Sequence, residues 1–220
     1  MINIYLLDGS VKQYQSGILA KDVIADISEG LLRNAIAVSI NGEICDLNTV
    51  IDNDCTLKAL TFKDEEGKNI YRHTSSHILA QAVKTIYPTA KLAIGPYVKN
   101  GFYYDIDFKT PITQDDLLLI EAEMQRIIKA DFPITRKTID ITQAKKLFNE
   151  EPYNLQLLEG ITDSTVSVYY QGNFFDLCRG PHLTSTGKIK AFKLTQLAGA
   201  YWRGDRKSTR LNSSHIPLSR

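Results

Sequence analysis

The chain has 220 residues, of which 43% are hydrophobic and 23% charged, and its net charge is +1. These values are ordinary for a globular protein of one large or two small domains. No apolar run approaches the roughly 20 residues of a membrane-spanning helix, and Asp8 interrupts the apolar N-terminus, so no signal peptide is recognised. Three cysteines do not make a disulfide framework, so we expect a reducing, cytoplasmic location.

Charge is unevenly distributed along the chain. Residues 1–61 carry 4 Lys and Arg against 8 Asp and Glu, whereas residues 62–204 carry 18 against 16. The first segment is therefore a poor electrostatic match for a phosphate backbone, and the second is only weakly basic. Charge alone does not indicate nucleic-acid binding.

Residues 1–61 are predicted to form a small domain of strands and one helix. Apolar residues alternate from Ile2 to Leu6, and Asp8-Gly9 supplies a hairpin turn before a second strand. A helix over residues 20–27 is expected to stop near Gly30. Three further strands are expected at residues 35–40, 44–47 and 56–60. This ββαβββ order is typical of a β-grasp, ubiquitin-like domain, and its Cys45 and Cys55 are interpreted as structural thiols.

A polar segment at residues 63–68 is predicted to be a hinge, which places the domain boundary between residues 61 and 62. The next helix is expected over residues 72–87, ending before Pro88. Its apolar residues gather on one side, whereas His73 and His77 share the opposite side because a four-residue spacing aligns side chains on a helix. These histidines are therefore expected outside the hydrophobic core, either solvated or forming the floor of a pocket.

The rest of residues 62–204 is predicted to mix strands and helices, which assigns the chain to the α+β class. Strands are expected at residues 102–107, 134–139, 155–158 and 166–170, and helices at 113–130 and 142–150. Thr113 and Asp116 fit a capping box at the first of these helices. Strand alternation puts Tyr104 and Ile106 on one face and Tyr103 on the other.

Residues 205–220 have no helical or strand periodicity and follow abruptly after Gly204. They look like the translation of a sequencing-library adapter. We interpret them as a foreign tail and expect the native sequence to be truncated near Gly204.

All the histidines outside that tail lie in two short motifs, His73-Thr74-Ser75-Ser76-His77 and Asp176-Leu177-Cys178-Arg179-Gly180-Pro181-His182. Three chemistries suit them: a four-ligand zinc site, hydrolysis of an activated ester by an ordered water, and a cysteine nucleophile paired with histidine. Asp176 is expected on the same strand face as Cys178, where its carboxylate disfavours a thiolate and suits a ligand with an ammonium group. The spacing indicates one shared site without choosing among the three.

The chain resembles the N-terminal half of threonyl-tRNA synthetases. The two histidine motifs carry the resemblance, together with Ile94-Gly95-Pro96, residues 100–105 and residues 198–205. It covers essentially residues 1–205: residues 1–61 are similar to the TGS domain, and residues 62–204 to the editing domain, which is related to the alanyl-tRNA synthetase editing fold. The resemblance implies hydrolysis of mischarged seryl-tRNA(Thr). A synthetase for threonine needs this second sieve because one methyl group is worth only about 1–3 kcal/mol in a binding pocket.

The same resemblance implies roles for individual residues. His73, His77, Cys178 and His182 would line the editing pocket as catalytic residues, and Asp176 would hold the serine ammonium group. Tyr104, Gly95 and Pro96 would wall the pocket and exclude the threonine methyl group.

The resemblance also implies cofactors and partners. Editing is expected to need no metal, although the same four positions bind zinc in related alanyl editing sites. ATP and Mg²⁺ would serve only a catalytic domain that is absent here. The partner would be the acceptor end of tRNA(Thr), with no membrane, and the parent enzyme would be a homodimer through its missing domains.

One residue departs from the family pattern. A lysine that helps to activate the water usually follows the Pro-Tyr pair, whereas Asn154 follows Pro152-Tyr153 here. Editing is then expected to be slower or to depend on a histidine. Two alternatives stay open, a zinc-dependent hydrolase of another ester and a non-catalytic RNA-binding module.

Overall fold

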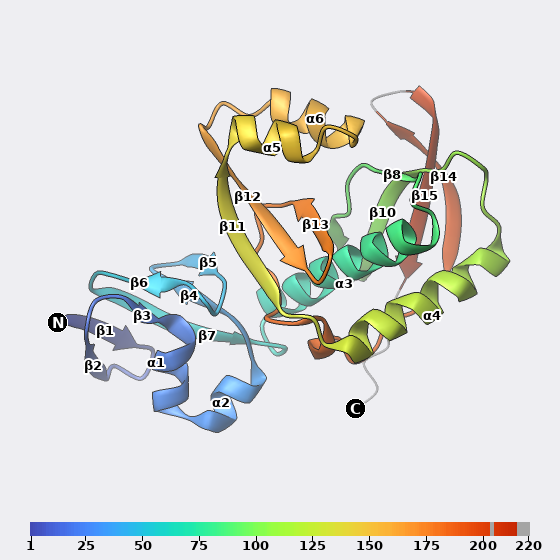
Figure 1. The fold of residues 1–220 in the computed structure, drawn as a ribbon. Coiled ribbons are helices and arrows are strands. Elements are labelled where there is room, and N and C mark those ends of the chain that lie inside the picture. Colours follow the sequence, from blue (N-terminus) through green and yellow to red (C-terminus); the bar gives the residue numbers. More distant parts are fainter. Residues whose placement is uncertain (203–204, 215–220) are drawn as a thin grey trace. The chain divides into compact units, whose positions relative to one another are not determined.

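The computed structural model describes the backbone of residues 1–202 and 205–214 and the side chains of residues 1–198. Arg203, Gly204 and residues 215–220 lie outside this part, so the expected domain end at Gly204 and the last residues of the tail are not described. The chain forms two compact units, one with residues 1–71 and 180–184 and the other with residues 72–179 and 185 onward. Helices and strands mix in both units, as the predicted α+β class requires (Figure 1).

The first unit contains a mixed five-stranded sheet in the order β2-β1-β7-β4-β5, in which β1 and β7 are parallel. Its larger elements are β1 (Ile2–Leu6), β2 (Val11–Tyr14), α1 (Ala20–Ile27), α2 (Glu29–Asn34), β4 (Ala35–Ile40), β5 (Glu43–Cys45) and β7 (Cys55–Thr61). Two short strands, β3 (Ile18–Leu19) and β6 (Val50–Ile51), pair with each other. This arrangement confirms the predicted β-grasp domain.

The core of this domain follows the predicted apolar pattern. Ile4 on β1, Val23 on α1 and Val38 on β4 are fully buried in one cluster, and Cys55 belongs to the same cluster. Cys45 is half-buried on the edge strand β5. The expectation that Gly30 ends the helix is wrong, because Ser28 caps a second helix, α2, which contains Gly30.

The second unit begins within the long helix α3 (Glu65–Ile86). Its other elements are β8 (Lys91–Leu92), β9 (Tyr97–Val98), β10 (Gly101–Asp107), α4 (Gln114–Ala130), β11 (Ile134–Asp140), α5 (Ile141–Leu147), α6 (Pro152–Glu159), β12 (Thr165–Gln171), β13 (Phe174–Leu177), the short 3₁₀ turn η1 (Thr186–Lys188), β14 (Gln196–Trp202) and β15 (Asp205–Ser214).

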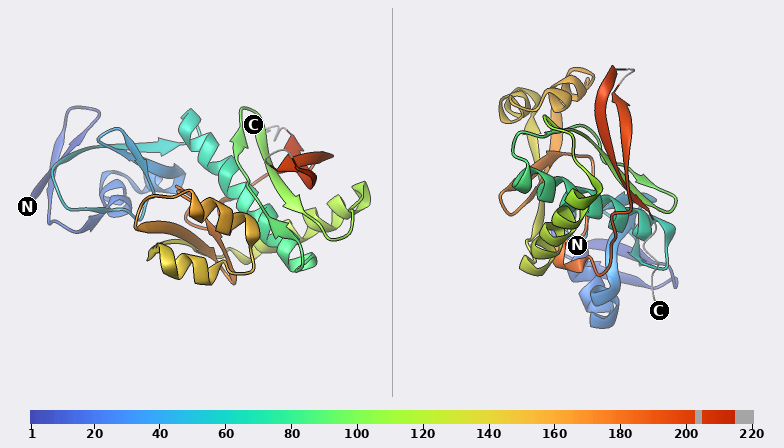
Figure 2. Two further views of the ribbon diagram at one scale, coloured as in Figure 1. Left: turned by 90° about the horizontal axis from the view of Figure 1, so that it is seen from above. Right: turned by 90° about the vertical axis from the view of Figure 1, so that its right-hand side faces the viewer.

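Two sheets of this unit hold α3 between them. One is the antiparallel sheet β11-β12-β13, and the other has the order β14-β15-β10-β8. Figures 1 and 2 show α3 running between β13 and β10. On the far face of the first sheet, Phe148, which follows α5, and Leu158 of α6 pack with Val168 of β12.

Three sequence-based expectations for this region are wrong. Residues 65–68 are not a hinge but the first turn of α3, where Glu65 and Glu66 favour the positive end of the helix dipole. Gly67 is needed there because a Cβ would overlap the carbonyl oxygen of Thr61. Residues 155–158 form part of helix α6 rather than a strand, with Pro152 as its first residue.

The third correction concerns the tail. Residues 205–214 show no strand periodicity in the sequence, whereas in the structure they form β15, which pairs antiparallel with both β10 and β14. The predicted foreign origin of these residues is a separate matter and stays a prediction. Two other expectations are confirmed: α4 starts with the predicted capping box, and Tyr104 and Ile106 are buried on one face of β10.

Candidate active site around helix α3

The histidine end of α3 is polar and buried at the same time. Thr74, Ser75, Ser76 and His77 are all buried, because α3 is covered by both sheets. The hydroxyl of Ser76 lies 2.7 Å from the carbonyl oxygen of His73 and 2.7 Å from that of Gly95. The rings of His73 and His77 stand edge to face with centroids 5.1 Å apart. His77 is thus neither solvated nor at the surface, and a packed polar layer surrounds it.

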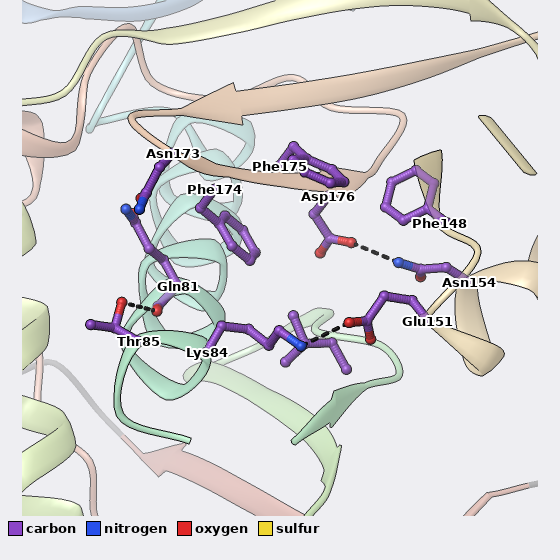
Figure 3. Close-up of a pocket in the computed structure, with 11 residues that line it drawn as sticks. Gln81, Lys84, Thr85, Phe148, Glu151, Asn154, Asn173, Phe174, Phe175 and Asp176 are labelled. Carbon is purple, nitrogen blue, oxygen red and sulfur yellow. Dashed lines mark hydrogen bonds and ion pairs between the residues drawn. The ribbon is translucent and has the colours of Figure 1, made fainter. Parts of the chain in front are cut away.

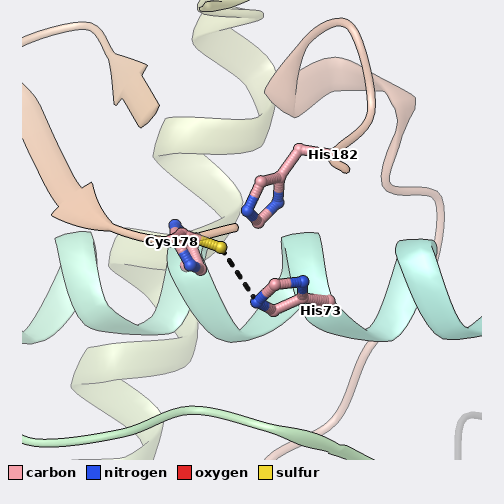
Figure 4. Close-up of side chains that lie close together, drawn as sticks. His73, Cys178 and His182 are labelled. Carbon is pink, nitrogen blue, oxygen red and sulfur yellow. Dashed lines mark hydrogen bonds between the residues drawn. The ribbon is translucent and has the colours of Figure 1, made fainter. Parts of the chain in front are cut away.

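Strand β13 and the residue after it place a carboxylate and a thiol next to the same helix. Side chains alternate along a strand, so Phe174 and Asp176 are buried on one face while Phe175 and Leu177 are half-buried on the other. The next residue, Cys178, places its Sγ 3.4 Å from Nε2 of His73 (Figure 4). The Gly180–Pro181 peptide bond that follows is cis and precedes His182.

The four predicted cysteine and histidine side chains gather closely. One nitrogen or sulfur atom from each of His73, His77, Cys178 and His182 lies within 4.8 Å of the corresponding atoms of the other three. The backbone amide of His182 donates a 2.9 Å hydrogen bond to the carboxylate of Asp46. Three imidazoles and one thiol are donor types that hold zinc tetrahedrally, so this donor set would suit a zinc ion.

Burial keeps both helix histidines neutral. It lowers the pKa of His77 to about 3 and that of His73 to about 3, in the second case with help from the neighbouring His77. Desolvation disfavours the imidazolium form, and neutral imidazoles have a lone pair for a metal ion or a water hydrogen. Nε2 of His77 lies 3.9 Å from Oδ2 of Asp176, which is too long for a hydrogen bond.

Asp176 is the buried carboxylate of the site. Its Oδ2 accepts a 2.6 Å hydrogen bond from the hydroxyl of Tyr104, and its Oδ1 accepts one from the backbone amide of Leu177 at 2.8 Å and a longer one from Asn154 at 3.4 Å. Burial raises the pKa of Asp176 to about 6, although these three hydrogen bonds act in the opposite direction. Burial and the neighbouring Asp176 raise the pKa of Tyr104, which therefore remains a donor.

Gly95 and Pro96, the other predicted wall residues, contact the strand that carries Tyr104. Gly95 packs so closely on the ring of Tyr104 that a Cβ would overlap it, which explains the glycine. The carbonyl oxygen of Pro96 accepts a 3.3 Å hydrogen bond from the amide of Tyr103, the neighbour of Tyr104 in β10.

Comparison with known proteins gives two family matches. The TGS domain matches residues 2–61, and the "Threonyl and Alanyl tRNA synthetase second additional domain" matches residues 166–212. Curated threonine–tRNA ligases from Acetivibrio thermocellus and Clostridioides difficile are 54% and 51% identical over 214 residues. A third, from Bacillus velezensis, is 49% identical over the same length. The chain belongs to the threonyl-tRNA synthetase family.

It represents only part of such an enzyme. The alignments cover 96% of this chain but 34%, 34% and 33% of these three relatives. The chain therefore spans about a third of the length of the curated threonine–tRNA ligases it matches and corresponds to their N-terminal TGS and editing domains. None of the helices that the structure describes is long and apolar enough to cross a membrane.

A cavity of about 410 Å³ opens next to Asp176, on the side of α3 toward its C-terminus (Figure 3). Apart from Asn154, the threonyl-tRNA synthetase resemblance assigned no role to its other lining residues. Apolar side chains form part of its wall, and the polar ones are Gln81, Lys84, Thr85, Glu151, Asn154, Asn173 and Asp176. His73, His77, Cys178, Tyr104, Gly95 and Pro96 do not line it.

Asn154, which stands where the family usually has a lysine, is buried and points at Asp176. Sequence reasoning singled out Asn154 only as a departure from the family pattern, just before an expected strand at residues 155–158, and did not name Lys84 or Glu151 as site residues. The one available signal was Pro152, which starts helix α6; Glu151 at its N-cap and Asn154 in its first turn both line the cavity.

Proposed function

We propose that this chain hydrolyses the ester bond of mischarged seryl-tRNA(Thr). The observation that carries the proposal is the close grouping of His73, His77, Cys178 and His182, next to a buried carboxylate, in a chain of the threonyl-tRNA synthetase family. An aminoacyl ester is an activated acyl group, so an oriented water can attack it without a covalent intermediate.

In this proposal the histidines bind and orient. A histidine whose pKa lies near 3 is a neutral imidazole at neutral pH, with one ring nitrogen free to accept, so His73 and His77 accept hydrogen bonds from the attacking water and from substrate hydroxyl groups. Cys178 and His182 complete the pocket opposite them. Asp176 receives the ammonium group of serine, since its carboxylate is buried and already oriented by Tyr104.

Selectivity against threonine would come from shape. The close packing of Gly95 on Tyr104 fixes the ring position, so the wall cannot move outward for an added methyl group. A steric conflict of that size is worth about 1–3 kcal/mol, or roughly 10- to 200-fold.

The partner in this reaction is the acceptor end of tRNA(Thr), and the location is the cytoplasm. In the full-length enzyme, threonine would be joined to tRNA(Thr) with ATP and Mg²⁺ by the domain absent here, and dimerisation would also involve the absent part.

A second candidate is a zinc-dependent hydrolase, which the four-ligand donor set favours. Zinc held by three of those residues, with the fourth position open, would polarise an ester carbonyl or lower the pKa of a bound water. A cysteine nucleophile is less favoured because the buried carboxylate of Asp176 two residues away opposes thiolate formation.

One experiment separates these candidates. Deacylation of seryl-tRNA(Thr) by the purified chain would be followed with and without a strong chelator, and with Cys178→Ser in parallel. We expect hydrolysis that survives chelation and survives, at reduced rate, in Cys178→Ser. Loss of activity on chelation with recovery by zinc would establish the metal hydrolase, and tRNA binding with no hydrolysis would establish an RNA-binding module.

A further inference from the structure

The cavity beside Asp176 has polar walls whose hydrogen-bonding capacity can be counted. Seven polar side chains line it, and three of them, Lys84, Glu151 and Asp176, carry charge. Figure 3 shows Asp176 and Glu151 directed into the same space, with Asn154 next to Asp176.

Lys84 has no donor left for a ligand. Its ammonium group donates to the carbonyl oxygens of Pro88 at 3.1 Å and Ala90 at 3.0 Å, and to Oε1 of Glu151 at 2.8 Å. A lysine has three N–H donors, so all are used. Lys84 therefore fixes Glu151 in place and does not offer itself to an anion.

Glu151 has an unused acceptor. Its Oε2 is buried and has no hydrogen-bond partner among the residues that the structure describes. A buried carboxylate oxygen without a donor is costly, so a donor from outside the protein is expected there. Asp176 also has room for one more donor, because its carboxylate accepts three hydrogen bonds and can accept about four.

The charges select the kind of donor. Lys84 balances one of the two carboxylates in the wall, which leaves one negative charge to be matched by the occupant. A primary ammonium group supplies three N–H donors and one positive charge, whereas a hydroxyl group supplies one donor and no charge.

We infer that Glu151 is a second recognition residue for the ammonium group of the aminoacyl substrate, its Oε2 accepting one N–H while Asp176 accepts another. This inference rests on the proposed editing function for the identity of the substrate. Lys84 acts through Glu151 as a positioning residue, because it holds Oε1 and so directs Oε2 into the cavity.

The test uses two small probes that differ at the amine, which is charged in one and acetylated and neutral in the other. L-Serinamide carries an ammonium group and cannot be hydrolysed as an ester, and N-acetyl-L-serinamide has the same hydroxyl group but a neutral amide. Each is titrated into the chain at a pH where the free amine is protonated, with amide NMR shifts as the readout. We expect binding of L-serinamide to perturb Glu151 and Asn154 and to be stronger than binding of the acetylated probe.

Glu151→Gln is the diagnostic variant because it keeps the size of the side chain and replaces an acceptor with an amide. It should weaken L-serinamide binding by about tenfold or more, the usual size for a hydrogen bond to a charged group, and leave N-acetyl-L-serinamide unchanged. Glu150→Gln removes the same charge one residue earlier, at an exposed position, and should change neither probe.

The outcomes keep this inference separate from the proposed function. Equal weakening of both probes in Glu151→Gln would show a merely structural role and overturn the inference. Unchanged L-serinamide binding in that variant would overturn it too, even if the chain deacylates seryl-tRNA(Thr) normally. Selective weakening of L-serinamide in a chain that hydrolyses no seryl-tRNA(Thr) would support the ammonium site while contradicting the editing function.

Discussion

The β-grasp domain and the surroundings of α3 bury different kinds of side chain. Among residues 1–61, every buried side chain is apolar, with Cys55 counted as apolar. Around α3, by contrast, buried polar groups include Ser76, His77, Asn154 and Asp176. Burying polar groups costs stability unless each finds a partner, so a fold that needed only stability would use the first solution. The contrast associates the proposed chemistry with the polar residues buried around α3.

The largest expected effect is on catalysis. His73→Ala should slow deacylation of seryl-tRNA(Thr) by about 100-fold or more, since it removes an imidazole that orients the water and contacts Cys178. Single-turnover deacylation measures this. Gln13→Ala, on an exposed strand of the β-grasp domain, is the control and should leave the rate unchanged. An unchanged rate in His73→Ala would remove this residue from the mechanism.

The next effect is on stability alone. Ile4→Ala should lower the free energy of unfolding of the first unit by about 2–5 kcal/mol, because Ile4 is fully buried and its truncation leaves a cavity. Urea denaturation followed by NMR reports this unit separately. Deacylation measured well below the transition should stay at the wild-type rate. A hundredfold loss of deacylation rate in the folded variant would contradict the view that the β-grasp core is only a scaffold and that the polar site acts independently of it.

Lowering the pH should also affect the stability of the two regions differently. The folded pKa of His77, about 3, lies below its unfolded value, so the folded state resists protonation and its stability falls as the pH drops below about 6.5. Between pH 7 and pH 5 the loss should be about 2 kcal/mol for this one group. Asp176 contributes with the opposite sign, because its raised pKa makes the folded state gain stability as the pH falls through about 6.

Residues 1–61 contain no histidine. Hydrogen bonds lower the pKa values of the exposed Asp8 and Asp54 there. The stability that these two carboxylates contribute is therefore lost only when the pH falls below their unfolded pKa values. NMR-detected urea denaturation at the two pH values should therefore show a loss for α3 and almost none for the β-grasp sheet. His77→Gln should reduce the loss at α3, and an equal loss in both regions would contradict the assignment.

The smallest effect tests whether the second unit also contains purely structural positions. Thr113→Ala removes the hydroxyl that donates to Asp116 at 2.9 Å at the start of α4. It should lower the free energy of unfolding by about 1 kcal/mol and leave the deacylation rate unchanged. A change in rate larger than twofold would mean that α4 is coupled to the site.

Much of this fold could be predicted from local pattern. Period-two alternation placed β1 and β10, and the capping residues placed the start of α4, because these signals depend on neighbours in sequence. The strand predicted at residues 155–158 is wrong because a short apolar run fits a strand and a helix equally well. Pro152 ends the preceding helix in the sequence-based prediction, whereas in the structure it is the first residue of α6.

The residues of the candidate site could be predicted from the sequence, but the hydrogen bonds and ion pairs between them could not. Two motifs sufficed to name His73, His77, Cys178 and His182. The hydrogen bond from Tyr104 to Asp176 joins residues 72 apart in sequence, and no local pattern contains it. Lys84 and Glu151, 67 residues apart, were missed for the same reason, and each alone looks like an ordinary surface charge.

The most direct test of the account compares two substrates on the unmodified chain. Single-turnover hydrolysis of seryl-tRNA(Thr) and threonyl-tRNA(Thr) would be measured side by side, without added metal. The account predicts that the seryl ester is cleaved at least about tenfold faster than the threonyl ester. Equal rates, or no hydrolysis of either beyond the uncatalysed rate, would contradict it.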